Sequence, residues 1–411
     1  MQSVLLAGWG FFPLDEELEL LPGKLMPGEH ERLVRLSGWV PFVRAVELLG
    51  DFLGIEVSKI VAQTYTEAAG AMYVQMQEEE VQQIESQMPV AVPSGEKMQL
   101  SADGAMIPLV HGMWAEVRTL VIGEVQPAVQ EKGEWVVHTR NLSYFSRKVS
   151  AQEFQRLALV EMHRRGVEQA REVAAVMDGA DWEQSFVDFH CPGAIRILDF
   201  PHAAEHIHQI GEFLHGEHTP KSQAWLKKQL QRLKQEGPDK LLLEVEKLGR
   251  KHPTVEAISS NLAYLKKRKP QMQYSLFQAQ GWPIGSGMVE SGNKLVVQAR
   301  LKGAGMHWAE QHVNPMLALR NILCSGRWKQ DWPLLEARLR QQSRQRRRIV
   351  HQVHHPKPPT TRIARALQGD FGNLVPQQLE QEPTSPKPMK NPWRNFKHGK
   401  ALYLPSTPPK I

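Results

Sequence analysis

Hydrophobic residues recur at helical spacing in the first part of the chain. No strand-like alternation occurs between residues 27 and 88, where the apolar positions follow a helical period. Pro41 to Leu53 predicts one helix, Gly54 a turn, and Ser58 the N-cap of a second helix. Two helices hinged at a glycine resemble a helix-turn-helix, although any helical hairpin looks similar. Residues 1–90 are therefore expected to form a helical module, with DNA contact and plain packing as its two alternatives.

The pattern changes to strands after Pro89. A first strand alternates apolar and polar residues, two further segments are rich in β-formers, and two short apolar runs are separated by helical segments. The predicted strands are Met98 to Asp103, Trp114 to Ile122, Trp135 to Arg140, Val173 to Met177 and Ala194 to Leu198. The order β-β-β-α-β-α-β predicts an α/β sheet in which the fourth strand lies parallel beside the first.

Strand patterns disappear beyond residue 203. Ser222 to Glu236 and Lys240 to Lys251 predict amphipathic helices, and the glycine-rich corner Gly281 to Gly287 precedes a helix that runs to about Leu301. His312 to Cys324 predicts a further apolar helix. The chain is thus expected to divide into a helical module (1–90), the first part of an α/β core (91–202), a helical insertion (203–280), the final core helices (281–330) and a basic, proline-rich tail (331–411).

Composition restricts the class of protein. Hydrophobic residues make up 41% of the 411 residues and charged residues 23%, which is ordinary globular usage and excludes wholesale disorder. Cys191 and Cys324 are the only cysteines, too few for a disulfide framework or a four-cysteine zinc site. No apolar run approaches 18 residues, so we expect neither a membrane span nor a membrane partner. The expected setting is cytoplasmic and associated with the nucleoid.

The net charge of +6 is unevenly distributed. Residues 331–411 hold 15 Lys and Arg against 5 Asp and Glu, a balance of +10, whereas the remainder holds 35 against 39, a balance of −4. Arg344, Arg346, Arg347 and Arg348 form a cluster, and 11 prolines follow between residues 356 and 409. We expect the chain beyond Arg340 to be extended or disordered in isolation. A basic tail favours a polyanionic partner such as DNA, and a merely solvating tail is the alternative.

Three carboxylates are candidates for chemistry. Asp103 is expected at the end of the first strand, Asp178 at the end of the fourth, and Glu290 on the helix after the insertion. Adjacent parallel strands would bring the aspartates together, and neighbouring anions favour hard metal ions such as magnesium. The alternatives are structural. Both aspartates precede Gly in an ordinary turn dipeptide, and Lys294, four residues after Glu290, could form a surface ion pair with it.

A second group of candidates follows the last predicted strand. Asp199 and His202 are three residues apart, which is compatible with an imidazole packed against a carboxylate. His202, Glu205 and His206 also spell H-x-x-E-H, in which two helical histidines bind zinc and the glutamate activates water. A zinc peptidase is therefore a rival hypothesis, although such a short pattern arises easily by chance.

Four segments together resemble a known family. MQLSADGAMIPLV, VAAVMDGADW, IRILDFPHAAEHI and especially GWPIGSGMVESGNKLVVQARLKGAGMHW are similar to the DDE transposases of bacterial insertion sequences, ISKra group, and more distantly to Mutator-like transposases. The likeness extends from about Gly8 to Trp328. It implies an RNase H-like catalytic core that is interrupted by an all-helical insertion before the final glutamate.

The resemblance also implies roles for residues. Asp103, Asp178 and Glu290 match the catalytic, metal-holding triad, and Asp199 and His202 match an auxiliary Asp-x-x-His motif. The implied cofactor is two Mg²⁺ ions, for which Mn²⁺ substitutes. The implied partners are the terminal inverted repeats of an insertion sequence and target DNA, bound by a homo-oligomer, and the implied activity is strand cleavage and transfer.

Other residues are candidates for DNA contact. In a regular helix Glu290, Lys294, Gln298 and Leu301 share one stripe, which would set Lys294 and Gln298 along the DNA path. A solvated helix face is the alternative for both. Trp282 and Trp308 border glycine-rich segments and could stack on a base, although core packing is the stronger interpretation.

The beginning of the chain departs from the family pattern. Related proteins typically carry a Cys-x-x-Cys zinc module before the segment that corresponds to Gly8 to Glu17, and no such cysteines precede it here. We therefore expect part of a DNA-recognition region to be absent. A DNA-binding protein that no longer transposes and inhibits an intact transposase is the alternative function.

Overall fold

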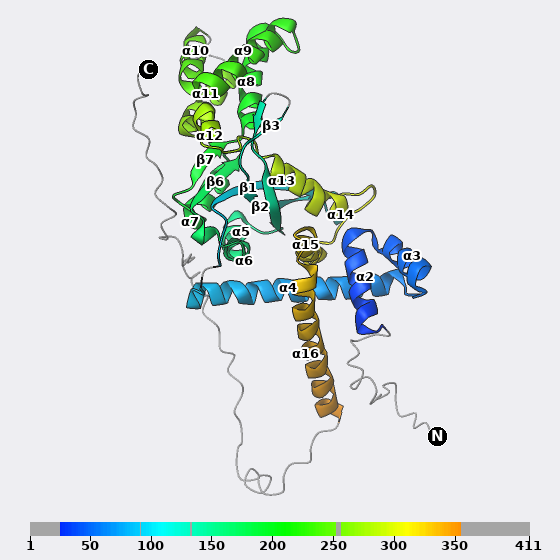
Figure 1. Ribbon diagram of the computed structural model, residues 1–411. Helices are drawn as coiled ribbons and strands as arrows, with labels where there is room; N and C mark the ends of the chain where they lie inside the picture. Colours follow the sequence, from blue (N-terminus) through cyan, green and yellow to red (C-terminus); the bar gives the residue numbers. More distant parts are fainter. Residues whose placement is uncertain (1–24, 91, 132–133, 252–255, 355–411) are drawn as a thin grey trace, which may run out of the picture.

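The computed structural model describes residues 25–90, 92–131, 134–251 and 256–354 (Figure 1). Its centre is a mixed five-stranded sheet with the order β5-β2-β1-β6-β7. The strands are β1 (Lys97–Pro108), β2 (Trp114–Val125), β5 (Thr139–Arg147), β6 (Glu172–Met177) and β7 (Ile195–Leu198). β2 is antiparallel to β1 and β5, whereas β1, β6 and β7 are parallel. The predicted α/β class, with the fourth main strand beside the first, is confirmed.

The third main strand lies later in the sequence than predicted. Residues 134–136 form β4 (Glu134–Val136), which pairs with β3 (Val129–Glu131) in a separate two-stranded hairpin. The strand that pairs with β2 is β5, whose buried side chains include Ser143, Ser146 and Arg147. Thr119 Oγ1 and Ser146 Oγ lie 2.9 Å apart in a hydrogen bond across the two strands. Because the buried residues of β5 combine polar side chains with Tyr144 and Phe145, its sequence does not show the regular apolar alternation of a strand.

The two faces of the sheet are covered by different helices. Met98, Leu100 and Ala102 of β1 join a core formed with α5 (Ala151–Leu157), α6 (Leu159–Arg164) and α7 (Asp181–His190). Side chains on the other face pack against α13 (Gly287–Gly292), η4 (Asn293–Gln298), α14 (Ala299–Leu301) and α15 (Glu310–Cys324). Alternation along β1 therefore directs Asp103 towards the face that α13 and η4 cover, as its odd position predicted.

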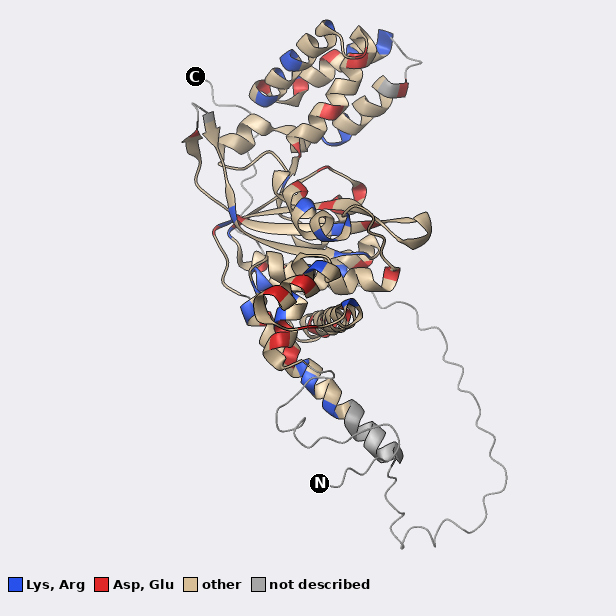
Figure 2. Ribbon diagram, turned by 90° about the vertical axis from the view of Figure 1, so that its right-hand side faces the viewer, with Lys and Arg blue, Asp and Glu red and all other residues tan. Residues whose placement is uncertain are grey.

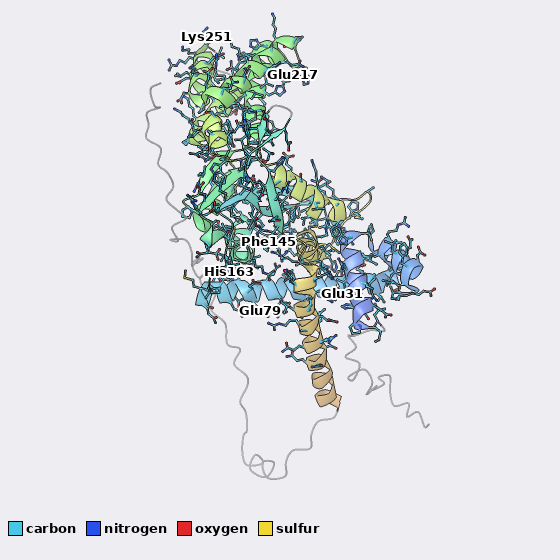
Figure 3. All side chains as sticks on the ribbon, in the orientation of Figure 1. Glu31, Glu79, Phe145, His163, Glu217 and Lys251 are labelled. Atoms are coloured by element: carbon cyan, nitrogen blue, oxygen red, sulfur yellow. The ribbon has the colours of Figure 1, made fainter. Side chains whose placement is uncertain are left out.

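A helical subdomain, defined here as residues 200–279, lies at one end of the sheet (Figure 1). It comprises α8 (Phe200–His215), α9 (Pro220–Glu236), α10 (Pro238–Lys251), α11 (Glu256–Lys267), the short η3 (Lys269–Met272) and α12 (Tyr274–Ala279). Its core continues into the sheet through Ala174, Val176 and Ile197. Glu217 and Lys251 lie at its far end, away from the strands (Figure 3). The predicted helices of this stretch are confirmed.

The N-terminal helices lie at the opposite end of the molecule (Figure 1). They are α2 (Pro27–Trp39), α3 (Phe42–Leu53) and α4 (Lys59–Gln87). Gly54 ends α3 with a φ of 65°, and the Ser58 hydroxyl accepts a hydrogen bond from the Val61 amide (3.2 Å), as both predictions required. The second helix is much longer than a typical recognition helix. α4 is a 29-residue helix whose buried face packs against α15. DNA contact by this module therefore stays a prediction.

The last described helix, α16 (Trp328–His354), corrects the expected tail. The boundary predicted at residue 331 falls inside this helix, and residues 341–354, which were expected to be extended or disordered in isolation, are helical. Trp328 and Trp332 stack with their ring centres 5.0 Å apart, and Tyr73 Oη of α4 donates to Asp331 (2.7 Å), which fixes the start of α16. Beyond this anchor the helix projects from the body (Figure 2).

The basic cluster lies on the projecting part of α16. Arg344 is exposed, whereas the side chains of Arg346, Arg347 and Arg348 and the whole of residues 355–411 lie outside the described part of the structure. α4 and α16 are long, yet no helix in the described ranges has an apolar stretch that could cross a membrane.

Candidate active site

The strand register brings Asp103 and Asp178 to the same level of the sheet. β1 and β6 pair with a constant offset of 75 residues, since Lys97 pairs with Glu172 (172 − 97 = 75). The same offset carries Asp103 to residue 178, the first residue after β6. Parallel neighbours at one level point to the same face of a sheet, so the two carboxyl groups approach each other. Asp103 itself lies inside β1 and not at its end, which corrects that detail of the prediction.

The next strand continues this row of carboxyl groups. β6 and β7 pair with an offset of 21 residues, since Ala174 pairs with Ile195 (195 − 174 = 21). The offset carries Asp178 to Asp199, the first residue after β7. Three consecutive parallel strands therefore present an aspartate at one level.

Two hydrogen bonds hold the Asp103 carboxylate. Its Oδ1 accepts from the Gly104 amide (2.6 Å), and its Oδ2 accepts from Asn293 Nδ2 (2.8 Å). Burial raises the pKa of Asp103, these two hydrogen bonds oppose the rise, and the negative charge of Glu290 adds to it. Asn293 was not predicted from the sequence. It connects β1 to the segment that follows Glu290.

Asp178 is the most crowded of the three carboxyl groups. Burial is the largest cause that raises the pKa of Asp178, and the charges of four neighbouring carboxylates add to it, so that this pKa reaches about 7. The four neighbours are Asp103, Asp199, Glu205 and Glu290. His202 Nδ1 lies 4.0 Å from Asp178 Oδ2 and 3.7 Å from Glu205. The His202 ring thus faces Asp178, although the sequence had suggested a contact with Asp199.

Asp199 has a different role from the other two aspartates. It is 3% exposed and caps α8, where its Oδ2 accepts from the His202 amide (2.9 Å). Its Oδ1 accepts from the Ser286 amide (2.6 Å), in the loop that leads to Glu290. Because backbone amides occupy both oxygens, Asp199 is suited to fixing the relative positions of α8 and α13 and poorly suited to binding a ligand.

Glu290 extends from a helix of changing geometry. α13 is α-helical, η4 is π-helical and α14 is α-helical again, so the regular helix predicted through Leu301 is wrong. Glu290 and Lys294 are exposed and Gln298 is half-buried, but Leu301 is fully buried. A π-turn contains an extra residue, which rotates the helix downstream of it and removes Leu301 from the predicted stripe.

Arg320 of α15 stabilises the π-helical segment. Its guanidinium donates to the carbonyl oxygens of Leu295 and Val296 (3.2 Å for Val296) and to that of Gly38 at the end of α2 (3.0 Å). The widened turn of η4 frees the carbonyl groups of Leu295 and Val296, and a buried cation with several donors satisfies them. The segment that carries Asn293 to Asp103 is thereby anchored to the rest of the fold.

A cleft of about 960 Å³ lies beside the start of α13. Its walls are the β3–β4 hairpin, residues 278–288 and Lys234 of α9, and it reaches Gly287 and Met288 close to Glu290. Trp135 lines it from the hairpin and is 69% exposed, an unusual position for so large an apolar side chain. The sequence did not identify Trp135, because an isolated Trp in a short strand carries no sign of exposure.

The two tryptophans that the sequence did single out belong to the core. Trp282 is 1% exposed, with Lys97 Nζ 4.6 Å from its ring centre, and Trp308 is 8% exposed and donates to the carbonyl oxygen of Leu301 (3.1 Å). Core packing, the stronger interpretation of both residues, agrees with this burial.

The H-x-x-E-H string does not form a zinc site here. His206 Nδ1 is 2.5 Å from Asn261 Oδ1, and its ring stacks on Tyr264 with centroids 4.0 Å apart. Glu205 is largely exposed, with its side chain directed at His202. The arrangement does not favour the zinc-peptidase hypothesis, because packing already engages one of its two histidines.

The carboxyl groups match the chemistry of a hard divalent cation. Within residues 25–354, where described, no three His, Cys, Asp or Glu side chains are close enough to hold a metal ion as they stand. The donors at Asp103, Asp178 and Glu290 are nevertheless all oxygens, and the charges that act most strongly on Asp178 are all negative. Such a set fits Mg²⁺, and we expect a bound cation to draw the carboxylates together by cancelling their repulsion.

Neither a protein-family model nor a curated protein matches the chain.

Proposed function

We propose that the protein is a DDE-type transposase that cleaves and joins DNA strands at the ends of an insertion sequence. One observation carries the proposal: Asp103 and Asp178 share one level of adjacent parallel strands, and Glu290 approaches them from a helix more than a hundred residues later. Structural turns and surface ion pairs do not account for this convergence, in which, besides burial, the charges of Asp103 and Glu290 both raise the pKa of Asp178 and the charge of Glu290 raises that of Asp103.

The arrangement of the elements supports an RNase H-like core. In the order β5-β2-β1-β6-β7 only β2 is antiparallel to the rest, and helices cover both faces, as that core requires. The helical subdomain lies between β7 and Glu290, where the family resemblance implies an insertion. In this proposal residues 91–202 and 281–330 form one catalytic core, which the helical subdomain interrupts and with which it shares only the start of α8 at residues 200–202.

The chain would hold two Mg²⁺ ions through Asp103, Asp178 and Glu290. When bound, such a pair activates the attacking water or 3′-hydroxyl and stabilises the leaving oxygen of the phosphodiester. Asn293 orients Asp103, and Asp199 fixes the loop that precedes Glu290. Exposed Lys294 is well placed to pair with a DNA phosphate near the carboxylates.

The proposed partner is DNA bound by a homo-oligomer in the nucleoid. The cleft beside α13 offers Lys234 to a phosphate and the exposed Trp135 ring to a base. The basic part of α16 and the tail would add sequence-independent affinity through Arg344, Arg346, Arg347 and Arg348.

The test is strand cleavage by the full chain. Duplexes that carry the sequences flanking the gene are incubated with the protein in Mg²⁺, Mn²⁺ or EDTA, and nicks are mapped on each strand, with binding measured in parallel. We expect metal-dependent nicking that is lost in Glu290→Gln. Glu310→Gln is the matched control. Glu310 is an exposed carboxylate at the start of α15, where it pairs with Lys148 and not with the candidate site.

The outcomes separate the candidate functions. Binding without nicking in any metal would favour the non-transposing inhibitor over the transposase. Neither binding nor nicking on any tested duplex would remove DNA as the partner. Nicking that Glu290→Gln retains would reject the assignment of the active site.

A further inference from the structure

The turn that carries Asp178 is held by side chains on both sides of its backbone. On one side the buried Glu183 accepts, through Oε2, the amides of Gly179 (2.8 Å) and Ala180 (3.1 Å). Glu183 is 2% exposed, and both hydrogen bonds are local, since Glu183 lies in the first turn of α7. This side of the turn is therefore fixed within the core itself.

The other side of the turn is held by the helical subdomain. Tyr264 Oη donates to the carbonyl oxygen of Asp178, and Arg268 Nε donates to that of Gly179 (2.9 Å). Arg268 also pairs with Asp181 (3.0 Å) and is itself buried. Tyr264 and Arg268 belong to the end of α11 and the residue after it, 86 and 89 positions from their acceptors.

The fit between the turn and the subdomain leaves no free space. Gly179 has a φ of 82°, and a Cβ added there would lie 2.6 Å from Tyr264 Oη and 3.0 Å from Arg268 Nε. Both the backbone conformation and the close approach require glycine. The subdomain therefore contacts the peptide groups of the turn directly.

Tyr264 also connects the turn to α8. Its ring stacks on His206, with an interplanar angle of 18°, and meets the His202 ring edge-on, with centroids 5.8 Å apart. His202 in turn faces Asp178. One tyrosine thus joins the subdomain, the histidine string and the turn.

We propose that the helical subdomain positions Asp178, with Tyr264 and Arg268 as the positioning residues that hold the backbone of its turn. The inference rests on the proposed function, because it explains the hydrogen bonds from Tyr264 and Arg268 as a means of placing a metal-binding carboxylate. β6 ends at Met177, so no strand pairing fixes the backbone of Asp178. A carboxylate that shares a cation must be held accurately, and groups outside the ligand set commonly supply that constraint.

Two variants and two matched controls test the positioning role. Tyr264→Phe removes the hydroxyl and keeps the ring stack, and Arg268→Met removes both hydrogen-bonding and charge. Lys267→Met is the control for Arg268, since Lys267 also pairs with Asp181 but does not contact the turn. Tyr65→Phe is the control for Tyr264, because Tyr65 packs against His30 in the N-terminal module.

The first measurement is DNA nicking across a magnesium titration. Removing an outer-shell group typically costs about 10- to 100-fold in metal affinity or activity. We expect Tyr264→Phe and Arg268→Met to raise the half-saturating Mg²⁺ concentration about tenfold, with nicking recovering at high Mg²⁺ and DNA affinity unchanged. Both controls should match the wild type.

The second measurement does not need activity. Hydrogen–deuterium exchange is followed in a peptide that covers residues 178–190, with a thermal melt to verify folding. We expect faster exchange at Gly179 and Ala180 in Tyr264→Phe, because the turn loses one of the two side chains by which the helical subdomain holds it, and wild-type exchange in Tyr65→Phe. If Arg268→Met does not fold, exchange at Gly179 and Ala180 in Tyr264→Phe alone decides whether the subdomain positions the turn.

The outcomes distinguish this inference from the proposed function. A wild-type chain without metal-dependent nicking would reject the function, and exchange would still test the hold on the turn. Unchanged exchange in Tyr264→Phe would overturn the inference. The inference would also be overturned if Lys267→Met raised the half-saturating Mg²⁺ concentration as much as Arg268→Met does, since loss of a positive charge would then explain both shifts.

Discussion

The same dipeptide, Asp-Gly, occurs twice in the candidate site and adopts two different structures. Asp103 and Gly104 lie inside β1, paired with Thr119 and Arg118 of β2. Asp178 and Gly179 follow the last residue of β6 and form a turn, in which Gly179 has a φ of 82°. The dipeptide does not determine the conformation, because strand pairing decides it in one case and the end of the strand in the other.

The difference extends to how each carboxylate is supported. Strand pairing fixes the backbone of Asp103, and the Asn293 side chain holds its oxygen. The turn of Asp178 has no such pairing. Side chains from α7 and the helical subdomain form hydrogen bonds with its peptide groups instead. Two aspartates with one proposed role thus depend on different parts of the fold. The regular strand needs little support, whereas the turn needs support from distant residues.

The largest expected effect tests whether the two aspartates are functionally equivalent. Asp103→Asn and Asp178→Asn each keep the side-chain volume and remove the charge that would hold a cation, so each should lower nicking by on the order of 10³-fold or more. Glu290→Gln should behave alike, with folding and DNA binding nearly intact. The measurement is the nicking rate in Mg²⁺ beside a thermal melt and a binding assay.

The double variant sharpens this test. Groups that act as one unit have non-additive effects, so Asp103→Asn combined with Asp178→Asn should cost scarcely more than either change alone. If one single variant retained wild-type nicking while the other lost it, the two aspartates would not share a cation site.

The second prediction concerns the two glycines. In Gly179→Ala the left-handed conformation costs roughly 1–2 kcal/mol, and the new methyl group would collide with Tyr264 Oη at 2.6 Å. In Gly104→Ala the added Cβ would collide with Glu116 Oε1 and lie 3.2 Å from Glu116 Cγ, so the Glu116 side chain must turn away, and the strand conformation suits alanine. We expect Gly179→Ala to lose about 10- to 100-fold in nicking and Gly104→Ala to stay within roughly 0.5 kcal/mol of wild-type stability.

Gly104→Ala serves as the matched control, and both variants are compared by thermal melts and nicking assays. Equal losses from the two substitutions would show that a tight backbone is needed at both aspartates and would erase the distinction between strand and turn.

Sequence patterns predicted the parts of the fold that local interactions determine. Alternation in β1 correctly directed Asp103 away from the core that contains Leu100 and Ala102. The helix from Pro41 to Leu53, its left-handed Gly54 and the Ser58 cap all follow from residues next to one another. The approach of Asp103 to Asp178 was also predicted, because adjacent parallel strands align their ends, whereas Asp199 was not expected to continue the row.

Residues that act through distant contacts were not predictable. Tyr264, Arg268 and Asn293 each bond to an acceptor at least 86 positions away, so neither spacing nor periodicity identifies them. β5 was misplaced because its buried residues mix polar side chains with Tyr144 and Phe145, so that no regular apolar alternation marks the strand. α16 was missed beyond Arg340 because residues 341–354 contain only three apolar residues, Ile349, Val350 and Val353. Sequence patterns reveal burial of apolar surface, whereas Tyr264, Arg268 and Asn293 act through pairing of polar groups.

A smaller effect is expected from removing the support of Asp103. Asn293→Ala deletes the donor to Asp103 Oδ2 and leaves the strand intact, so the carboxylate loses orientation but keeps its place. The buried hydrogen bond contributes on the order of 1 kcal/mol, and we expect a fall in nicking of about tenfold. Thermal melts measure the change in stability, and the nicking rate across a magnesium titration measures the loss of activity. A loss as large as that of Asp103→Asn would mean that Asn293 is itself a ligand.

The smallest expected effect is on stability in the absence of metal. Burial and four neighbouring carboxylates raise the pKa of Asp178 to about 7, so its protonated form is favoured in the folded state. The stabilising contribution is complete below the unfolded pKa of 3.8 and is lost as pH rises through about 7. An asparagine resembles the protonated acid at every pH. In EDTA, Asp178→Asn should therefore melt above the wild type at pH 8, and the gap should close as pH falls towards 4.

Asp103 supplies the comparison for this last prediction, because Asp103→Asn removes a carboxylate that two hydrogen bonds already stabilise. We expect a gain for Asp178→Asn of roughly 1 kcal/mol or less, since the group is 38% exposed and partly screened by solvent, and a smaller gain for Asp103→Asn. The measurement is the melting temperature of three chains from pH 4 to pH 8. A larger gain at Asp103, or a gap at Asp178 that does not narrow at low pH, would show that repulsion among the carboxylates is not what separates the two sites.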